Sequence, residues 1–173
     1  MRAYARRFGE DEETWGIVGL LHDFDYERWP DPPDHPLQGA AILTELGYPP
    51  EVIYAIKSHA DYLTDYPRVS LLDKALYACD ELSGFVTAVA LLRPERLADM
   101  QASSVKKKLK TKNFAASINR DDIRRGAEDL GVDLDEHIQF VIAALETVAT
   151  ELGLANNAAS SDPESESPAS PSS

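Results

Sequence analysis

Two side chains that could bind a metal, His22 and Asp23, stand side by side at the end of the apolar segment 15–21. Because this segment should be buried, an imidazole and a carboxylate without partners would be costly or would shift their pKa values. A hydrogen-bonded pair in a turn would satisfy both groups, and so would a divalent metal ion. The dipeptide alone does not decide between these interpretations.

Three more side chains of this chemistry occur at or near apolar faces of predicted helices: His35, His59 and Asp80. Such imidazole and carboxylate ligands suit Mn²⁺, Fe²⁺, Co²⁺ or Zn²⁺ better than Mg²⁺ alone, which prefers oxygen. One or two such ions would polarise a phosphoryl oxygen and lower the pKa of a bound water. The sequence has no nucleophile motif around a serine, so we expect metal-activated water as the nucleophile.

The first two ligands follow a predicted helix that Asp11 caps and that ends at His22. Its apolar residues occupy nearly the whole circumference, so we expect a central, buried helix, with Gly16 and Gly19 allowing a neighbour to approach closely. The stretch 25–34 holds three prolines and is expected to be a loop beside the His-Asp pair.

The other two histidines lie next to predicted helices. His35 precedes Pro36, which begins a helix over 37–46 that Gly47 ends. The positive end of this helix disfavours protonation of His35 and keeps a lone pair available. A further helix begins at 49–50, and its apolar stripe is formed by Val52, Ile56, His59 and Leu63. A hydrogen-bonded core histidine remains the alternative for His59.

The carboxylate Asp80 lies at the edge of the apolar stripe of a long helix predicted from 71 to about 92. A capping box of Ser70 and Asp73 begins that helix. From this edge Asp80 can point to solvent or into a cleft between helices. Two more helices are predicted over 120–130 and 134–153, and His137 is expected at the surface.

The chain of 173 residues shows no strand alternation, which predicts an all-α fold of about seven helices around a cleft. We expect one domain over residues 1–154. Residues 155–173 are rich in Ser, Pro, Ala and acids, and are predicted to be a disordered tail. No apolar run is long enough for a membrane span. The single Cys79 excludes an internal disulfide, and a reducing cytoplasm fits best; the oligomeric state stays open.

The net charge of −13 argues against general binding of nucleic acid. Residues 103–125 nevertheless carry five lysines and three arginines against two aspartates. This local basic face suits a small anionic substrate, and a solvated helix face is the alternative. The candidate phosphate-binding residues are Lys106, Lys107, Lys110, Lys112 and Arg120.

The order His22-Asp23, His35, His59 and Asp80 in a helical chain resembles the HD-domain superfamily of metal-dependent phosphohydrolases. More narrowly, the run from Gly19 to Tyr26, with the later basic segment, is similar to small bacterial HD-domain hydrolases. The resemblance covers roughly residues 2–153 and implies a helical bundle around a metal site.

The resemblance also implies roles for the candidate residues. A first metal would be held by His22, Asp23 and Asp80, and a second by His35 and His59 with Asp23 as a bridge. In a mononuclear site the latter two histidines would contact the phosphate. Asp25 and Asp61 could carry protons or support the ligands.

The family pattern begins with one more histidine, on a helix upstream of the His-Asp pair. No histidine precedes His22 in this sequence. Because the predicted helix 2–8 begins at Met1 without a cap, we expect a segment bearing this ligand upstream. A site with one ligand fewer is the alternative, which would imply a weakened enzyme or a binding protein.

Three functions therefore compete. The first is hydrolysis of a phosphoester in a nucleotide or other small phosphorylated molecule. The second is a non-catalytic module for ligand binding or signalling on the same fold. A di-iron oxygenase, a class also known in the superfamily, is the third and the least favoured.

Overall fold

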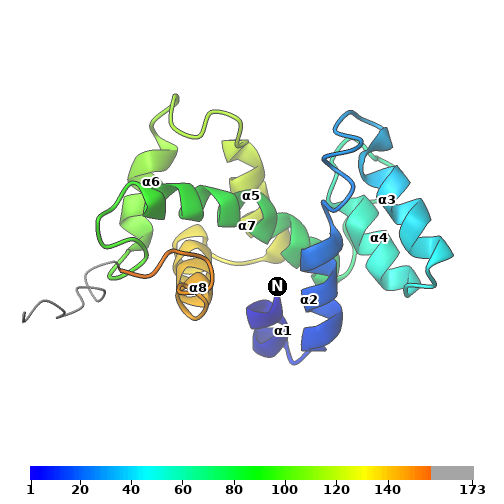
Figure 1. Ribbon diagram of the computed structural model, residues 1–173, viewed down its shortest axis with the longest axis horizontal. Coiled ribbons are helices and arrows are strands. Elements are labelled where there is room, and N and C mark those ends of the chain that lie inside the picture. Colours follow the sequence, from blue (N-terminus) through cyan, green and yellow to red (C-terminus); the bar gives the residue numbers. More distant parts are fainter. Residues whose placement is uncertain (157–173) are drawn as a thin grey trace, which may run out of the picture.

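The computed structural model describes residues 1–156, which form eight α-helices and no strand (Figure 1). The all-α prediction is confirmed, with one helix more than the approximate count. The predicted tail lies outside the described residues except for its first two. Among the described helices, none has the length and apolar character that a membrane span requires. The helices are α1 (Arg2–Phe8), α2 (Glu12–Leu21), α3 (Asp34–Glu45), α4 (Pro50–Ser58), α5 (Leu71–Leu91), α6 (Ala102–Leu109), α7 (Arg120–Leu130) and α8 (Leu134–Glu146).

Side-chain caps fix the start of several helices, as the sequence predicts. The Asp11 carboxylate accepts from the Thr14 N–H at the start of α2, and Ser70 with Asp73 forms a complete capping box on α5. At the other end, Gly131 adopts a φ of 74° and closes α7. These local signals fix where the helices begin and end, and so where the candidate ligands lie on them.

Helix α5 runs through the centre of the molecule and contributes to two hydrophobic cores (Figure 1). Its first half packs against α1 to α4 through residues such as Leu72 and Leu76. Its second half packs against α6 to α8 through Phe85 and Val89. In Figure 1, α3 and α4 therefore lie on one side of α5, and α6 and α8 lie on the other.

The closest contact of α5 is with α7. A Cβ atom added to Gly126 of α7 would lie 2.7 Å from the Cα atom of Ala78 on α5. Only glycine allows this approach, because any side chain would meet backbone. The two helices are therefore packed backbone against backbone at this point.

Helix α2 is less buried than its apolar composition predicts. Trp15 and Val18 are buried, but Leu20 is 78% exposed, so the expectation of a helix buried on all sides is wrong. The predicted close neighbour is present, because Arg2 and Met1 lie against Gly16 and Gly19. Composition shows that a face is apolar, but it does not show whether another element covers it.

Two helices end earlier than their apolar stripes predict. Helix α4 ends at Ser58 and not near Leu63, with His59 as its C-cap. Helix α8 ends at Glu146, and turns follow it up to residue 153. In both cases apolar residues beyond the helix still pack from turns, so the periodicity alone does not mark the end.

His137 is fully buried, which corrects the expectation of a surface position. Its Nδ1 atom accepts a hydrogen bond from the Tyr4 hydroxyl at 2.6 Å, and its Nε2–H donates to the Ala78 carbonyl at 2.9 Å. The side chain thus joins α8 to α1 and α5. The position was mispredicted because its partners lie far away in sequence.

The buried His137 makes stability depend on pH. Burial, together with the nearby Arg7 charge, lowers the pKa of His137 below 6.5 although the Ala78 carbonyl acts in the opposite direction. As the pH falls below 6.5, the unfolded chain takes up a proton that the folded chain refuses, so the free energy of unfolding decreases. We expect this slope, at most about 1.4 kcal/mol per pH unit, to be smaller in His137→Gln. Urea unfolding between pH 5 and 8 measures it, and equal slopes in both proteins would contradict the prediction.

Candidate metal centre

The five predicted ligands converge from four elements of the fold. His22 is the C-cap of α2 and Asp23 follows it, while His59 is the C-cap of α4. His35 has non-helical backbone angles just before the regular part of α3, and Asp80 lies in the middle of α5. His22, Asp23 and His59 thus come from the ends of helices, and His35 comes from a kink at the start of α3.

The ligand atoms form two clusters that share one residue. His22, Asp23 and Asp80 each offer an atom to the first cluster, and Asp23, His35 and His59 each offer one to the second. The two carboxylate oxygens of Asp23 are divided between them. Oδ2 lies 3.4 Å from His22 Nε2, and Oδ1 lies 3.3 Å from His35 Nε2. Asp23 therefore has the geometry of a bridge.

Hydrogen bonds fix the tautomer of all three histidines. Each Nδ1 atom faces an oxygen that can only accept: the Gly19 carbonyl for His22, the Asp25 carboxylate for His35, and the Ile56 carbonyl for His59. Each Nδ1 must therefore carry the proton, which leaves the Nε2 lone pairs free when the rings are neutral. All three Nε2 atoms face the clusters.

This arrangement fits a cation better than it fits hydrogen bonding. The Nε2 atoms of His35 and His59 are 3.3 Å apart, and neither neutral ring has a proton to share there. His22 Nε2 is likewise 3.3 Å from an oxygen of Asp80. Metal–ligand bonds of about 2.1 Å at tetrahedral or octahedral angles place neighbouring ligand atoms about 3.0–3.5 Å apart. The observed spacings match this value.

The electrostatics of the clusters also favour positive charge. Burial would lower the pKa of His22, but the hydrogen bond and charge of Asp80, with the charge of Asp23, outweigh burial and raise it. Burial would raise the pKa of Asp23, but its hydrogen bond to His59 and the nearby imidazoles outweigh burial and lower it. The site therefore favours the ionised form of Asp23 and attracts a proton or a metal ion.

A second set of residues holds His35 in place. Asp25 is buried; its Oδ1 accepts from His35 Nδ1 at 2.8 Å and its Oδ2 accepts from the Gly39 N–H at 2.8 Å. A Cβ atom on Gly39 would lie 2.7 Å from the Asp25 carboxyl carbon. The Tyr62 hydroxyl donates to the His35 carbonyl. Of the two roles predicted for Asp25, this geometry favours support of a ligand over proton transfer to substrate.

The sequence reasoning missed Gly39 and Tyr62. A local signal was available for Gly39, which lies four residues after His35, a spacing that brings residues close together on a helix. Tyr62 contacts His35 from 27 residues away, so no local spacing indicates it. Neither residue type binds metal readily, so a search for ligands passes over them.

Asp61, the third predicted catalytic residue, belongs to neither cluster. Its carboxylate accepts from Arg68 at 2.6 Å and from the Tyr77 hydroxyl at 2.9 Å, and it also pairs with Arg125. Its oxygens are thus engaged in a network of residues that are not candidate ligands. A role for Asp61 as a proton carrier or as a support for the ligands stays a prediction.

The predicted phosphate-binding lysines are not brought to the metal ligands. Val105 and Leu109 bury one side of α6, which leaves the lysines on the side exposed to solvent. Lys106 pairs with Asp135 at 2.6 Å. Lys107, Lys110 and Lys112 are exposed, and Figure 1 places α6 at the opposite end of the molecule from α3 and α4. The alternative of a solvated helix face describes this segment.

Arg120 has a structural role as well. Its guanidinium donates to the carbonyls of Ala115 and Ile118, and also to that of Phe114. It lies 5.5 Å from the centre of the Phe85 ring. These contacts hold the loop that precedes α7. Substrate binding by Arg120 stays a prediction.

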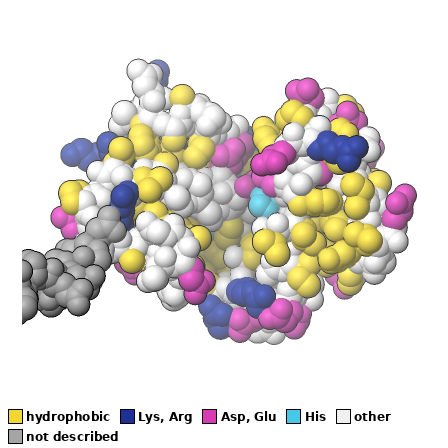
Figure 2. All heavy atoms as spheres, in the orientation of Figure 1, with side chains coloured by type: hydrophobic (Ala, Val, Ile, Leu, Met, Phe, Trp, Pro, Cys, Tyr) yellow, Lys and Arg dark blue, Asp and Glu magenta, His cyan; other side chains and the backbone are white. Residues whose placement is uncertain are grey.

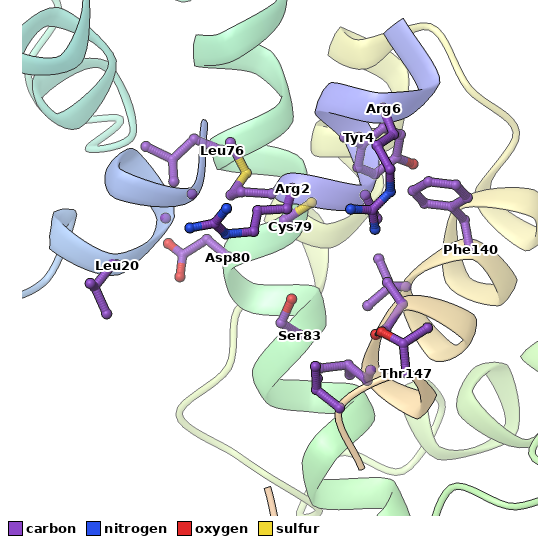
Figure 3. A pocket seen from close by; sticks show the side chains of 18 of the residues that line it. Arg2, Tyr4, Arg6, Leu20, Leu76, Cys79, Asp80, Ser83, Phe140 and Thr147 are labelled. Carbon is purple, nitrogen blue, oxygen red and sulfur yellow. The ribbon is translucent and has the colours of Figure 1, made fainter. Parts of the chain in front are cut away.

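A cleft of about 610 Å³ adjoins the first cluster, with His22 and Asp80 in its wall. Figure 3 shows Asp80 and Ser83 of α5 on one side of this cleft, Arg2 and Arg6 of α1 on another, and Phe140 of α8 opposite. Cys79 also lines it, and burial raises the pKa of its thiol to about 11, so the sulfur stays protonated. Figure 2 shows a histidine side chain at the surface beside acidic side chains, between the two halves of the molecule.

Fold and site together define an all-helical protein with a candidate centre for two metal ions. A family model for the HD domain matches residues 1–84, a segment that contains all five candidate ligands. The matched segment, residues 1–84, therefore belongs to the HD-domain superfamily, whose members are mostly hydrolases. Searches among curated proteins and among solved structures found no match.

Proposed function

We propose that the protein is a metal-dependent phosphohydrolase with a binuclear centre. The observation that carries this proposal is the division of the Asp23 carboxylate between two clusters, each with two further ligands. Membership of the HD-domain superfamily supports the reaction class. The substrate we propose is a small phosphorylated molecule, such as a nucleotide.

In this proposal the chain's own residues hold and orient the reaction centre. His22, Asp23 and Asp80 would bind one divalent ion, and Asp23, His35 and His59 would bind the other. The Asp25 carboxylate and the Ile56 carbonyl fix the two histidines of the second cluster with their lone pairs inward. When bound, a pair of divalent ions supplies a hydroxide nucleophile at neutral pH and offsets negative charge on the phosphoryl oxygens.

Metal removal and reloading test the proposal. We expect the protein to lose hydrolysis of p-nitrophenyl phosphate after chelation, and to regain it with Mn²⁺ or Co²⁺ at about two ions per chain. Single substitutions Asp80→Asn and His35→Gln should each leave about one ion, because each removes a ligand from one cluster only. The exposed Asp65→Asn variant is the matched control.

Two results would count against this function. Retention of phosphatase activity in a rigorously metal-free protein would exclude a metal mechanism. Tight binding of two ions without hydrolysis of any phosphoester in a broad panel would favour a ligand-binding module instead.

A further inference from the structure

A single arginine outside the metal site contacts the chain on both sides of His59, at a backbone carbonyl before it and at a side-chain carboxylate after it. The Nη1 atom of Arg68 donates to the Ser58 carbonyl at 3.3 Å and to the Asp61 carboxylate at 2.6 Å. Ser58 immediately precedes His59, and Asp61 follows it by two residues. Because α4 ends at Ser58, the segment that follows is held by turn hydrogen bonds, such as Leu63 N–H to the Ala60 carbonyl, in place of a continued helical ladder.

Arg68 is itself fixed by two other helices. Its guanidinium pairs with the Asp129 carboxylate of α7, with Nε at 3.1 Å and Nη2 at 3.0 Å. The guanidinium carbon lies 3.6 Å from the centre of the Tyr77 ring on α5. The Arg68 side chain is only 14% exposed. Charge pairing, a stacked ring and shielding from water together leave this side chain little freedom.

The network also reaches Asp61 directly. The Tyr77 hydroxyl donates to Asp61 at 2.9 Å, and Arg125 of α7 pairs with the same carboxylate. Asp61 thus pairs with both Arg68 and Arg125, and Arg68 also pairs with Asp129 of α7. Helix α7 lies beyond residue 84, outside the segment that the family model matches.

We propose that Arg68 is a positioning residue for the second metal cluster, and that it transmits the position of α7 to His59. In the absence of Arg68, the turn after α4 loses contacts on both sides of the ligand and His59 samples more positions. The first cluster does not depend on this segment. His22 is the C-cap of α2, Asp23 follows it, and Asp80 lies in α5. This inference rests on the proposed metal centre.

The test measures Mn²⁺ affinity by equilibrium dialysis in two backgrounds that each retain one cluster. In Asp80→Asn the remaining ion depends on His59, and we expect Arg68→Gln to weaken its binding by roughly 10- to 100-fold, the usual effect of losing a residue that orients a metal ligand. In His35→Gln the remaining ion is held by the first cluster, and Arg68→Gln should change its affinity by less than about twofold.

The matched control is Arg124→Gln, which removes an exposed arginine that pairs with Asp121 on the same helix. It should leave both affinities unchanged. Asp129→Asn is the second variant; it keeps Arg68 but removes its anchor on α7, so we expect a smaller weakening confined to the Asp80→Asn background. Should Arg68→Gln not fold, this second variant decides.

The outcomes separate the inference from the function on which it rests. Equal weakening in both backgrounds would show general destabilisation and would overturn the positioning role. Unchanged affinity in the Asp80→Asn background would overturn it as well. Failure of the unsubstituted protein to bind Mn²⁺ would instead overturn the proposed metal centre, and the positioning role with it.

Discussion

The variant Asp23→Asn is expected to lose both metal ions and nearly all phosphatase activity. Asp23 is the one residue present in both clusters. Its Oδ1 atom faces His35 and His59, and its Oδ2 atom faces His22, which shares a cluster with Asp80. An amide keeps the shape of the side chain but removes its charge, and it replaces one acceptor oxygen by an NH₂ group that cannot bind a cation.

The size of this effect follows from the double role. Loss of a residue that only orients a ligand costs about 10- to 100-fold in metal affinity or activity. Damage to two clusters at once should therefore cost roughly 10²- to 10⁴-fold. Elemental analysis and turnover of p-nitrophenyl phosphate measure it, with Asp65→Asn as the control. A variant that retains two ions would show that Asp23 does not bridge.

Asp25→Asn is expected to weaken the second cluster selectively. The Asp25 carboxylate accepts from two donors, His35 Nδ1–H and the Gly39 N–H, and it is 2% exposed. An asparagine there has one oxygen for two donors, so its NH₂ group must face an N–H of one of them. Either His35 loses its fixed tautomer or a buried backbone donor loses its partner.

We expect this substitution to lower the Mn²⁺ affinity of the second cluster by roughly 10- to 100-fold. Dialysis in the Asp80→Asn background isolates that cluster, and the first cluster, measured in His35→Gln, should be nearly unaffected. Asp34→Asn is the matched control, since Asp34 is exposed and only accepts from Gln38. Equal affinities with and without the substitution would show that Asp25 has no part in orienting His35.

The elements that could be predicted are those whose signals are local. Asp11, Ser70 and Asn119 act on backbone N–H groups two or three residues away, so their helices begin where the sequence indicates. The five candidate ligands could be proposed because His and Asp on apolar faces need compensation. Their convergence, with the shared position of Asp23, follows only from the packing of α2, α3, α4 and α5.

The environment of some residues depends on partners that are distant in sequence. His137 was mispredicted because its partner Tyr4 lies 133 residues away, and the Asp61 carboxylate pairs with Arg125, 64 residues away. The run of lysines in α6 suggested a phosphate-binding face, but these lysines lie on the solvent side of the helix. A run of charge indicates an exposed face, but it does not show what that face is near.

The match to the HD domain stops at residue 84, within α5, which continues to Leu91. The two halves of this helix belong to different cores, and Gly126 of α7 packs on Ala78, inside the matched segment. A cut at the similarity boundary would therefore divide a helix and strip α7 from the part that bears the ligands. The segment that matches the family model is therefore smaller than the packed unit around the candidate ligands, and a fragment ending at residue 84 would lack the helix that packs on Ala78.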